Sequence, residues 1–257
     1  MRRRAGPASD RPRLVLGVGA GLYLGSSLTA GSHAHHAVQL VVGLDGPIDV
    51  VLEDGARSMR AALVASGVEH GIDAKGRLVV VLVDREAQGG AALDRVARER
   101  HGEDLAAHLT ITSPPSEASP RALLAWADAL HAPLREGGAR PARAARSPAV
   151  RAALEHVHAT LDGRPRLEEA AACAGISASR LTHLFSEEVG LPFRRYVLWA
   201  RAKRALSEVR GGATLTRAAV ASGFSDAAHL SRTFRRMFGL APSSLFELAD
   251  IDGDADE

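Results

Sequence analysis

The sequence predicts an α+β protein with two domains: a β-barrel with trailing helices, then an all-α domain of two helix-turn-helix units joined by a long linker helix. Three observations lead to this fold class. Apolar residues alternate along segments of roughly the first 110 residues, which indicates strands. A Gly-, Pro- and Arg-rich segment at 136–147 has no apolar period, which predicts a linker. After it, the apolar spacing becomes helical and one helical layout occurs twice.

The composition is that of a globular protein, with 46% hydrophobic and 24% charged residues and a net charge of +2. The charge is unevenly placed, because residues 147–246 hold 14 Lys and Arg against 8 Asp and Glu. A basic C-terminal region suits a phosphate backbone. The single cysteine, Cys173, excludes an internal disulfide and a cysteine-based zinc cluster, and it fits a reducing compartment. No apolar run is long enough for a bilayer, so we expect a cytoplasmic protein without a membrane partner.

The β-rich domain is predicted at 13–135, after a basic start at 1–12 for which we expect no order. The glycine-rich apolar run 14–24 predicts one strand. A continuous apolar run predicts a buried strand at 78–83, and helical spacing of apolar residues predicts helices at 91–100 and 121–130. The apolar stripe of the last helix suits either packing on the barrel or contact with a second copy of the chain.

A β-hairpin is predicted in the middle of this domain. Apolar residues alternate at 38–44 and again at 48–52, and Asp45-Gly46 lies between the two segments. Asp-Gly between alternating runs is a strong hairpin signal, although Pro47 delays the start of the second strand.

The all-α domain is predicted at 148–248, and two of its segments, 167–189 and 215–238, share one layout. Each has a short alanine-rich helix, a glycine that ends it, a residue that can cap the next helix, and a second helix with apolar spacing. The repeated positions, 48 residues apart, are Gly175 and Gly223 for the turn and Ser177 and Ser225 (or Asp226) for the cap. Equal spacing of two such patterns predicts a duplicated helix-turn-helix domain. Cys173, among alanines, is expected to be a small core residue.

The segment 192–209 between the two units predicts a helix with two apolar faces, which must pack on both sides. Its length is about 25 Å at the helical rise of ~1.5 Å per residue. The second helices of the two units are therefore expected about one DNA turn apart, ~34 Å. The acidic end at 249–257 is expected to have no structure.

The region 150–246 resembles the AraC/XylS-type transcription regulators. The resemblance lies in 174–190 for the first unit, in 192–206 for the linker helix, and in 222–242, which begins Ser-Gly-Phe-Ser-Asp, for the second. It implies activation or repression of genes by a monomer that reads two successive major grooves of double-stranded DNA. RNA polymerase is a further partner if the protein is an activator. Phe246 stands where many relatives carry an arginine, so one backbone contact is expected to be missing.

The predicted DNA-contacting residues lie on the second helix of each helix-turn-helix unit and at the start of the linker helix. Arg can pair bidentately with guanine, Ser and Thr can bond either base edge, and Ala can meet a thymine methyl. The base-reading positions are Ser179, Arg180, Thr182, His183 and Ser186 in the first unit, and Ala227, Ala228, Ser231, Arg232 and Arg235 in the second. Arg194, Arg195 and Arg236 are expected to contact phosphates, which position the protein without specifying sequence.

The N-terminal domain carries His33-x-His35 with Gln39, and then Gly-x-x-His ending at His70. This pattern resembles the two motifs of a cupin barrel, which the family often joins to its DNA-binding domain as an effector-binding and dimerising part. Gln39 stands where the metal-binding motif has a carboxylate, and Ala65 replaces its proline. Because Gln is a poor ligand for a divalent ion, we expect no metal and no cofactor. His33, His35, Gln39 and His70 are instead expected to line an effector pocket.

Three functions remain open on the sequence. The leading one is a ligand-responsive transcription regulator that is not an enzyme and has no catalytic residues. The second is a metal-dependent cupin enzyme that carries a DNA-binding module. The third is a regulator whose barrel only forms a homodimer and senses nothing, with the histidines in a structural role.

Overall fold

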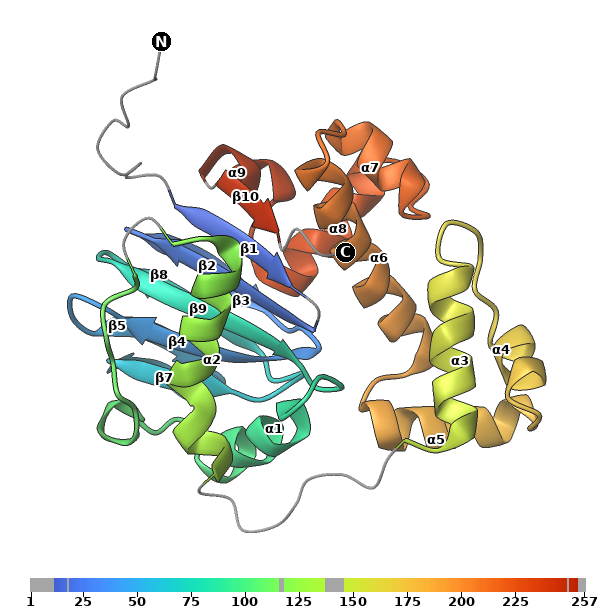
Figure 1. The fold of residues 1–257 in the computed structure, drawn as a ribbon, viewed down its shortest axis with the longest axis horizontal. Helices are drawn as coiled ribbons and strands as arrows, with labels where there is room; N and C mark the ends of the chain where they lie inside the picture. Colours follow the sequence, from blue (N-terminus) through green and yellow to red (C-terminus); the bar gives the residue numbers. More distant parts are fainter. Residues whose placement is uncertain (1–11, 18, 116–117, 137–145, 249, 254–257) are drawn as a thin grey trace. The chain divides into compact units, whose positions relative to one another are not determined.

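The computed structural model describes residues 12–17, 19–115, 118–136, 146–248 and 250–253. The chain forms two compact units, one of residues 1–139 with 238–257 and one of residues 140–237. The first is built mainly of strands and the second of helices (Figure 1). The α+β class is confirmed. Among the described residues, no helix is both long enough and apolar enough to cross a membrane.

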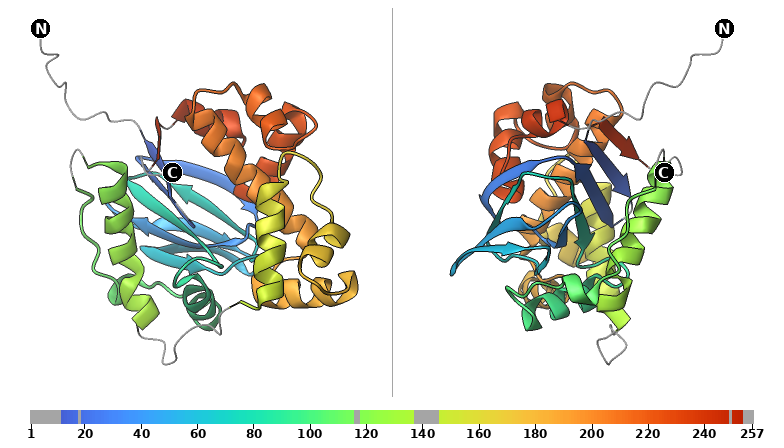
Figure 2. Two further views of the ribbon diagram at one scale, coloured as in Figure 1. Left: turned by 45° about the vertical axis from the view of Figure 1, so that its right-hand side comes forward. Right: turned by 90° about the vertical axis from the view of Figure 1, so that its left-hand side faces the viewer.

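The strands of the first unit form two sheets. They are β1 (Arg13–Gly17), β2 (Ala20–Gly25), β3 (Leu28–His33), β4 (Ala37–Gly43), β5 (Ile48–Leu52), β6 (Gly55–Met59), β7 (Ala61–Val64), β8 (His70–Ala74), β9 (Leu78–Asp84) and β10 (Asp250–Gly253). One sheet has the order β10-β1-β2-β9-β4-β7, and the other has the order β3-β8-β5-β6. Figure 2 shows the strands from two further sides. All strand pairs are antiparallel except β1 with β10. Together the sheets make a barrel-like domain.

The helices of the first unit are α1 (Gly90–Glu99), the short 3-10 helix Ala106–His108, α2 (Pro120–Glu136) and α9 (Pro242–Leu248). The core between the first sheet and helices α1 and α2 takes alternate residues of β4, Val38, Leu40 and Val42, because successive side chains of a strand point to opposite faces. The other residues of β4 are buried too, Gln39 among them, so both faces of this strand are covered.

The apolar stripe of α2 takes part in the same core. Leu123, Ala127 and Leu130 are each at most 2% exposed. Of the two roles open for the stripe, packing on the barrel is therefore the one it fulfils. The predicted helices at 91–100 and 121–130 and the buried strand at 78–83 are confirmed as α1, α2 and β9, with α2 longer at both ends.

The prediction of one strand at 14–24 is wrong, because this run folds into the β1–β2 hairpin. Gly19 has φ +71°, a left-handed conformation that glycine adopts without steric cost, and it lies at the reversal. The Gly19 carbonyl also accepts a 2.8 Å hydrogen bond from the Asp84 amide, which ties the hairpin to β9. An apolar run alone gave no sign of this reversal.

The predicted hairpin around Asp45-Gly46 is also wrong. β4 pairs with β7 and β9 in one sheet, whereas β5 lies in the other sheet between β6 and β8. Both edges of β4 are thus occupied by other strands, and the chain leaves its sheet at Leu44, whose amide donates to the Arg77 carbonyl at 2.7 Å. Asp45-Gly46 is a turn that carries the chain between sheets.

The acidic end differs from expectation as well, because residues 250–253 form β10 alongside β1. β1 is otherwise an edge strand, whose unpaired backbone groups can accept a further strand. The predicted basic start lies almost entirely outside the described residues, as do residues 137–145 of the predicted linker.

The second unit is helical. Its elements are α3 (Pro148–Ala159), α4 (Leu167–Cys173), α5 (Ala178–Val189), α6 (Phe193–Arg210), α7 (Leu215–Ala221) and α8 (Ala227–Phe238), of which the last ends at the boundary of the unit. The sequence predicts five of these helices at these positions: the short helices α4 and α7, the second helices α5 and α8, and the linker helix α6.

Candidate functional site

The first helix-turn-helix consists of α4, a turn and α5. Gly175 ends α4 with φ +66°, and the Ser177 hydroxyl accepts a 3.2 Å hydrogen bond from the Arg180 amide at the start of α5. A side-chain oxygen at this position satisfies an amide that has no partner inside the helix. The predicted turn and cap are confirmed.

The second helix-turn-helix consists of α7, a turn and α8. Gly223 has φ +80°, and a Cβ there would lie 2.5 Å from the Leu161 carbonyl oxygen, so both conformation and space require glycine. Of the two candidate caps, the structure selects Asp226, whose carboxylate accepts a 2.6 Å bond from the His229 amide. This bond lowers the pKa of Asp226 below its usual value. Ser225 donates its hydroxyl to the Asp226 carboxylate.

The reading positions of α5 lie opposite its buried face, which is formed by Leu181, Phe185 and Val189. Four of the five predicted residues are exposed and the fifth is half-buried. The exposed ones are Ser179, Arg180, Thr182 and His183, and the half-buried one is Ser186. The Thr182 hydroxyl donates to the Ala178 carbonyl of its own helix at 2.9 Å, so only its acceptor lone pairs face outward.

The reading positions of α8 lie opposite Leu230, Thr233 and Phe234, which are buried. The exposed predicted residues are Ala228, Arg232 and Arg235, and the half-buried ones are Ala227 and Ser231. The three arginines expected at phosphates are exposed: Arg194 and Arg195 in the first turn of α6, and Arg236 in α8.

Helix α6 packs against both helix-turn-helix units, and it uses different residues for each. The Phe185 ring of α5 lies 5.4 Å from the ring of Phe193 and 5.5 Å from that of Tyr196, both edge-on. Further along α6, Ala205 packs in one core cluster with Phe224 and Leu230 of the second helix-turn-helix unit. The prediction of two buried faces is confirmed. A helix held at both ends fixes the separation of α5 and α8 within this part of the chain.

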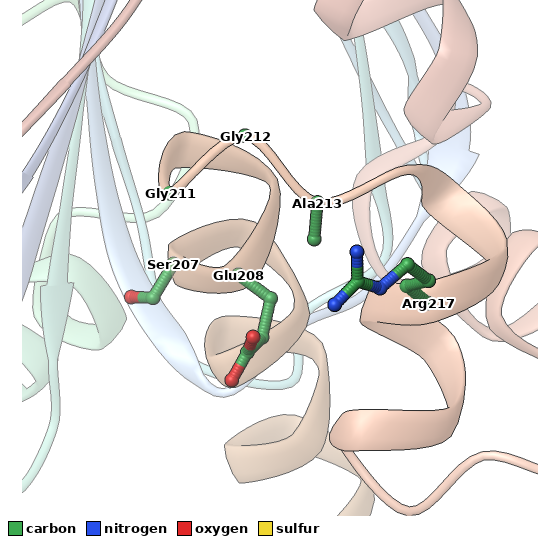
Figure 3. Close-up of a pocket in the computed structure, with 6 residues that line it drawn as sticks. All are labelled: Ser207, Glu208, Gly211, Gly212, Ala213 and Arg217. Carbon is green, nitrogen blue, oxygen red and sulfur yellow. The ribbon is translucent and has the colours of Figure 1, made fainter.

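A hollow of about 330 Å³ lies where α6 ends and α7 begins (Figure 3). Its lining residues are Ser207, Glu208, Gly211, Gly212, Ala213 and Arg217. Sequence reasoning did not single out this hollow, and no predicted reading residue lines it.

A separate cluster of polar groups lies in the first unit, where β3 ends and β8 begins. His33 and His70 are opposite each other across the two strands, after a bulge in the pairing, and their ring centroids are 4.2 Å apart. His35 follows in the connection to β4, with its ring 5.5 Å from that of His33 and 5.1 Å from that of His70. The Gly67 amide donates to the His35 carbonyl at 2.8 Å and holds the two segments together.

The three imidazoles share one hydrogen-bonding arrangement. Each Nδ1 lies 2.7–2.9 Å from a backbone carbonyl oxygen: that of Gly31 for His33, of Ala37 for His35 and of Val68 for His70. Because a carbonyl can only accept, each Nδ1 carries the hydrogen. In an uncharged ring, Nε2 then keeps a lone pair.

Burial keeps the rings uncharged at neutral pH. Burial is the largest cause that lowers the pKa of His35 to about 4 and that of His70 to about 3, and it also lowers the pKa of His33. One nitrogen of each ring lies within 4.8 Å of one nitrogen of each of the others. Gln39 joins the cluster through its side-chain oxygen, 3.1 Å from His35 Nε2. The structure thus brings together all four residues predicted as a group.

A supporting network that sequence reasoning missed holds the loop before His70. The Asp94 carboxylate of α1, 4% exposed, accepts a 2.8 Å bond from the Ser66 amide and forms ion pairs with Arg85 and Arg98. Arg98 also donates to the Ser66 carbonyl at 2.8 Å. Only the Asp94–Arg98 spacing of four residues on a helix is visible in the sequence.

The expectation for Cys173 is wrong, since this residue is exposed. α4 is only two turns long, and its buried side is formed by Ala170 and Ala171, so Cys173 at its end faces away from the core. Its sulfur lies 3.6 Å from His156 Nδ1 of α3.

Comparison with known proteins agrees with this geometry. Residues 170–247 match the family described as a helix-turn-helix domain. No match is found among curated protein sequences. The class defined by this match and by the two capped units is that of DNA-binding transcription regulators. The match spans the two helix-turn-helix units and fits the resemblance of this region to the AraC/XylS-type transcription regulators.

Two of the similar solved structures extend over both the strand-rich unit and the helical unit. ToxT from Vibrio cholerae O395 has a TM-score of 0.55 and 13% identity over 89% of this chain and 97% of its own. ToxT from strain SCE256 with an unsaturated fatty acid bound has a TM-score of 0.53 and 11% identity, over 90% of this chain and 95% of its own. An AraC-type regulator from Chromobacterium violaceum is 26% identical over 38% of this chain and 88% of its own, with a TM-score of 0.36. The ToxT likeness shows a shared fold.

Proposed function

We propose that this regulator binds DNA sequence-specifically by placing α5 and α8 in two successive major grooves, and that a small molecule bound in its N-terminal domain controls it. The observation that carries the first part is the packing of α6 on both helix-turn-helix units. A fixed spacing of two reading helices is what binding to two successive major grooves requires, because these grooves are ~34 Å apart in duplex DNA. Each unit also presents a row of exposed polar side chains on its reading helix.

The two reading helices differ in the contacts that they can make. α8 offers Arg232 and Arg235, which suit bidentate bonds to guanine, and Ala228, which suits a thymine methyl. α5 offers Arg180 and His183 among small hydroxyl residues. We infer that α8 makes the larger contribution to specificity, and that Arg194, Arg195 and Arg236 position the domain on phosphates.

Replacement Arg232→Ala tests the base-reading role. We expect the variant to lose about 1–3 kcal/mol of discrimination between operator and scrambled duplex, because a bidentate base contact contributes that much. The measurement is titration of both duplexes at one fixed salt concentration, with an operator selected from random duplexes by the full-length protein. The matched variant Arg236→Ala should weaken binding to both duplexes alike, as loss of a phosphate contact does. An equal loss on both duplexes for Arg232→Ala would make Arg232 a phosphate contact.

The N-terminal domain is the part of the chain in which we expect the small-molecule effector to bind. We infer a cupin-type barrel, because the His-x-His and Gly-x-x-His segments meet at the end of two paired strands, among otherwise apolar strands. Buried polar groups in such a place are typical of small-molecule sites. ToxT, which has this fold, binds an unsaturated fatty acid and a naphthalenyl butenoic acid. We infer that His33, His35, Gln39 and His70 line the site of a small-molecule effector, toward which uncharged Nε2 atoms offer hydrogen-bond acceptors.

A further inference from the structure

The turn glycines of the two helix-turn-helix units, Gly175 and Gly223, share a backbone conformation but differ in what surrounds them. Their φ angles are +66° and +80°. Among the described residues, a Cβ added at Gly175 would meet no further atom within 4 Å, whereas a Cβ at Gly223 would lie 2.5 Å from the Leu161 carbonyl oxygen and 2.7 Å from Arg201 Nε. Two other segments of the chain therefore lie directly against the second turn, and the first turn has no such neighbour in this part of the chain.

The turn that contains Leu161 goes with the first helix-turn-helix unit. It follows α3, which packs on α4 and α5. The Gly163 amide donates to the Thr160 carbonyl at 3.0 Å, and the Thr160 hydroxyl donates to the His156 carbonyl of α3 at 2.8 Å. Leu161 itself is buried. Because these bonds hold the turn to the end of α3, its carbonyls move with the first unit.

Arg201 extends from the middle of the linker helix α6 to the same turn. Its Nε donates to the Leu161 carbonyl at 3.3 Å, and its Nη2 donates to the Gly163 carbonyl at 2.6 Å. Carbonyls at the end of a helix lack partners within it, and a cationic side chain there also faces the negative end of the helix dipole. The guanidinium is partly withdrawn from water, which together with the charge of Arg164 lowers the pKa of Arg201. We call the group of Leu161, Gly163, Arg201 and Gly223 the Arg201 joint.

The Arg201 joint constrains the two units in a way that apolar packing on α6 does not. Contacts such as those of Phe193 and Ala205 hold each unit on the helix, but the hydrophobic effect has no directional preference. The guanidinium presents its donors in a rigid planar fork, and hydrogen bonds weaken steeply when their angle changes. In addition, Gly223 of the second unit lies directly against Leu161 of the first. Rotation of one unit about the axis of α6 would therefore break these contacts.

We propose that the Arg201 joint fixes the rotation of the second helix-turn-helix unit about α6, and that Arg201 is thereby a positioning residue that sets the operator spacing. The inference rests on the proposed function, in which α5 and α8 enter successive major grooves. In duplex DNA, one added base pair shifts the second sub-site by ~3.4 Å and rotates it by about a tenth of a turn. A unit with a fixed rotation cannot follow its sub-site. The reading side chains thus select the bases, and the Arg201 joint selects the number of base pairs between the sub-sites.

The test compares two duplexes with each variant of the full-length protein: a selected operator, and the same operator with one base pair inserted between the sub-sites. The measured quantity is the ratio of the two dissociation constants at one fixed salt concentration. We expect a ratio of roughly ten for the wild-type protein, because a displaced reading helix forfeits base contacts. A variant that is merely less stable loses affinity for both duplexes alike, so a purely structural role leaves the ratio unchanged.

Replacement Arg201→Ala should lower this ratio below roughly three, because the second unit can then turn to follow its sub-site, with its ordering cost moved to the binding step. Arg201→Lys keeps the charge but lacks the planar fork, so it should lower the ratio as well. This variant carries the test if Arg201→Ala does not fold. Arg204→Ala is the matched control, because Arg204 lies on the same helix in a partly exposed 3.7 Å ion pair with Glu208. Its ratio should equal that of the wild type.

The two turn glycines supply an independent pair of variants. Gly175→Ala and Gly223→Ala both place a side chain at positive φ, so both should lower the melting temperature. Only Gly223→Ala must also displace the Leu161 carbonyl or the Arg201 guanidinium. We therefore expect Gly223→Ala to lower the ratio as Arg201→Ala does, and Gly175→Ala to leave it unchanged.

Failure of this inference and failure of the proposed function give different results. Circular dichroism and thermal melting show which variants are folded. If folded Arg201→Ala or Arg201→Lys kept the wild-type ratio, or if Arg204→Ala lowered it equally, the Arg201 joint would not set the spacing, although preference for the selected operator would persist. Equal binding of both duplexes by the wild-type protein would overturn the inference too. A wild-type protein that bound the selected operator no better than a scrambled duplex would instead contradict the proposed function.

Discussion

Replacement of Phe185 by alanine is expected to lower the free energy of unfolding of the second unit by about 3–5 kcal/mol, the usual cost of removing a buried phenylalanine. Phe185 is fully buried, and its ring contacts Phe193 and Tyr196 edge-on. These contacts join α5 to the linker helix, so their loss both opens a cavity and releases the first reading helix. Operator affinity should fall with stability.

Two tryptophans allow this change to be assigned to one unit. Trp199 of α6 is buried in the second unit, and Trp126 of α2 lies in the first. Urea unfolding followed by fluorescence in a Trp126→Phe background reports on α6. Glu187→Ala, an exposed neighbour on α5, should change stability by no more than about 0.5 kcal/mol. A loss below 1 kcal/mol for Phe185→Ala would show that α5 is not anchored on α6.

Replacement of Asp94 by alanine is expected to destabilise the first unit by about 1–3 kcal/mol, the usual cost of leaving a buried hydrogen-bonding group without its partner. The carboxylate is 4% exposed, and its loss leaves Arg85 and Arg98 uncompensated and the Ser66 amide without its acceptor. The loop that leads to His70 loses its anchor at the same time.

The measurement for Asp94→Ala is urea unfolding in a Trp199→Phe background, where Trp126 reports on α2. Arg95→Ala is the matched control, because its 3.9 Å ion pair with Glu99 is exposed and of small effect. If Asp94→Ala were as mild as Arg95→Ala, the network around Ser66 would not hold the loop.

The helical part of the fold could be predicted from the sequence because its signals are local. A glycine with positive φ and a capping side chain act within four residues, and both occur twice at the same spacing, as at Gly175 and Gly223. The choice between Ser225 and Asp226 as the cap was not predictable, since either oxygen can reach the amide.

The strands were harder to predict, because their pairing depends on distant segments. Asp45-Gly46 has the composition of a hairpin turn, yet both edges of β4 are taken by β7 and β9. The histidine cluster was predicted from motif spacing, but the tautomers that decide its chemistry depend on the carbonyls of Gly31, Ala37 and Val68. No sequence pattern reports the direction of a carbonyl.

We infer that α6 fixes the separation of the two reading helices within one chain. The most direct test of this fixed separation is the affinity of the full-length protein for a selected operator with two base pairs inserted between the sub-sites. The insertion displaces one sub-site by ~7 Å along the axis and rotates it by about a fifth of a turn. We expect at least a tenfold loss, since one reading helix then forfeits base contacts of about 1–3 kcal/mol each, while the same insertion outside the sub-sites changes nothing. Unchanged affinity would show that α6 does not fix the spacing or that only one unit reads sequence.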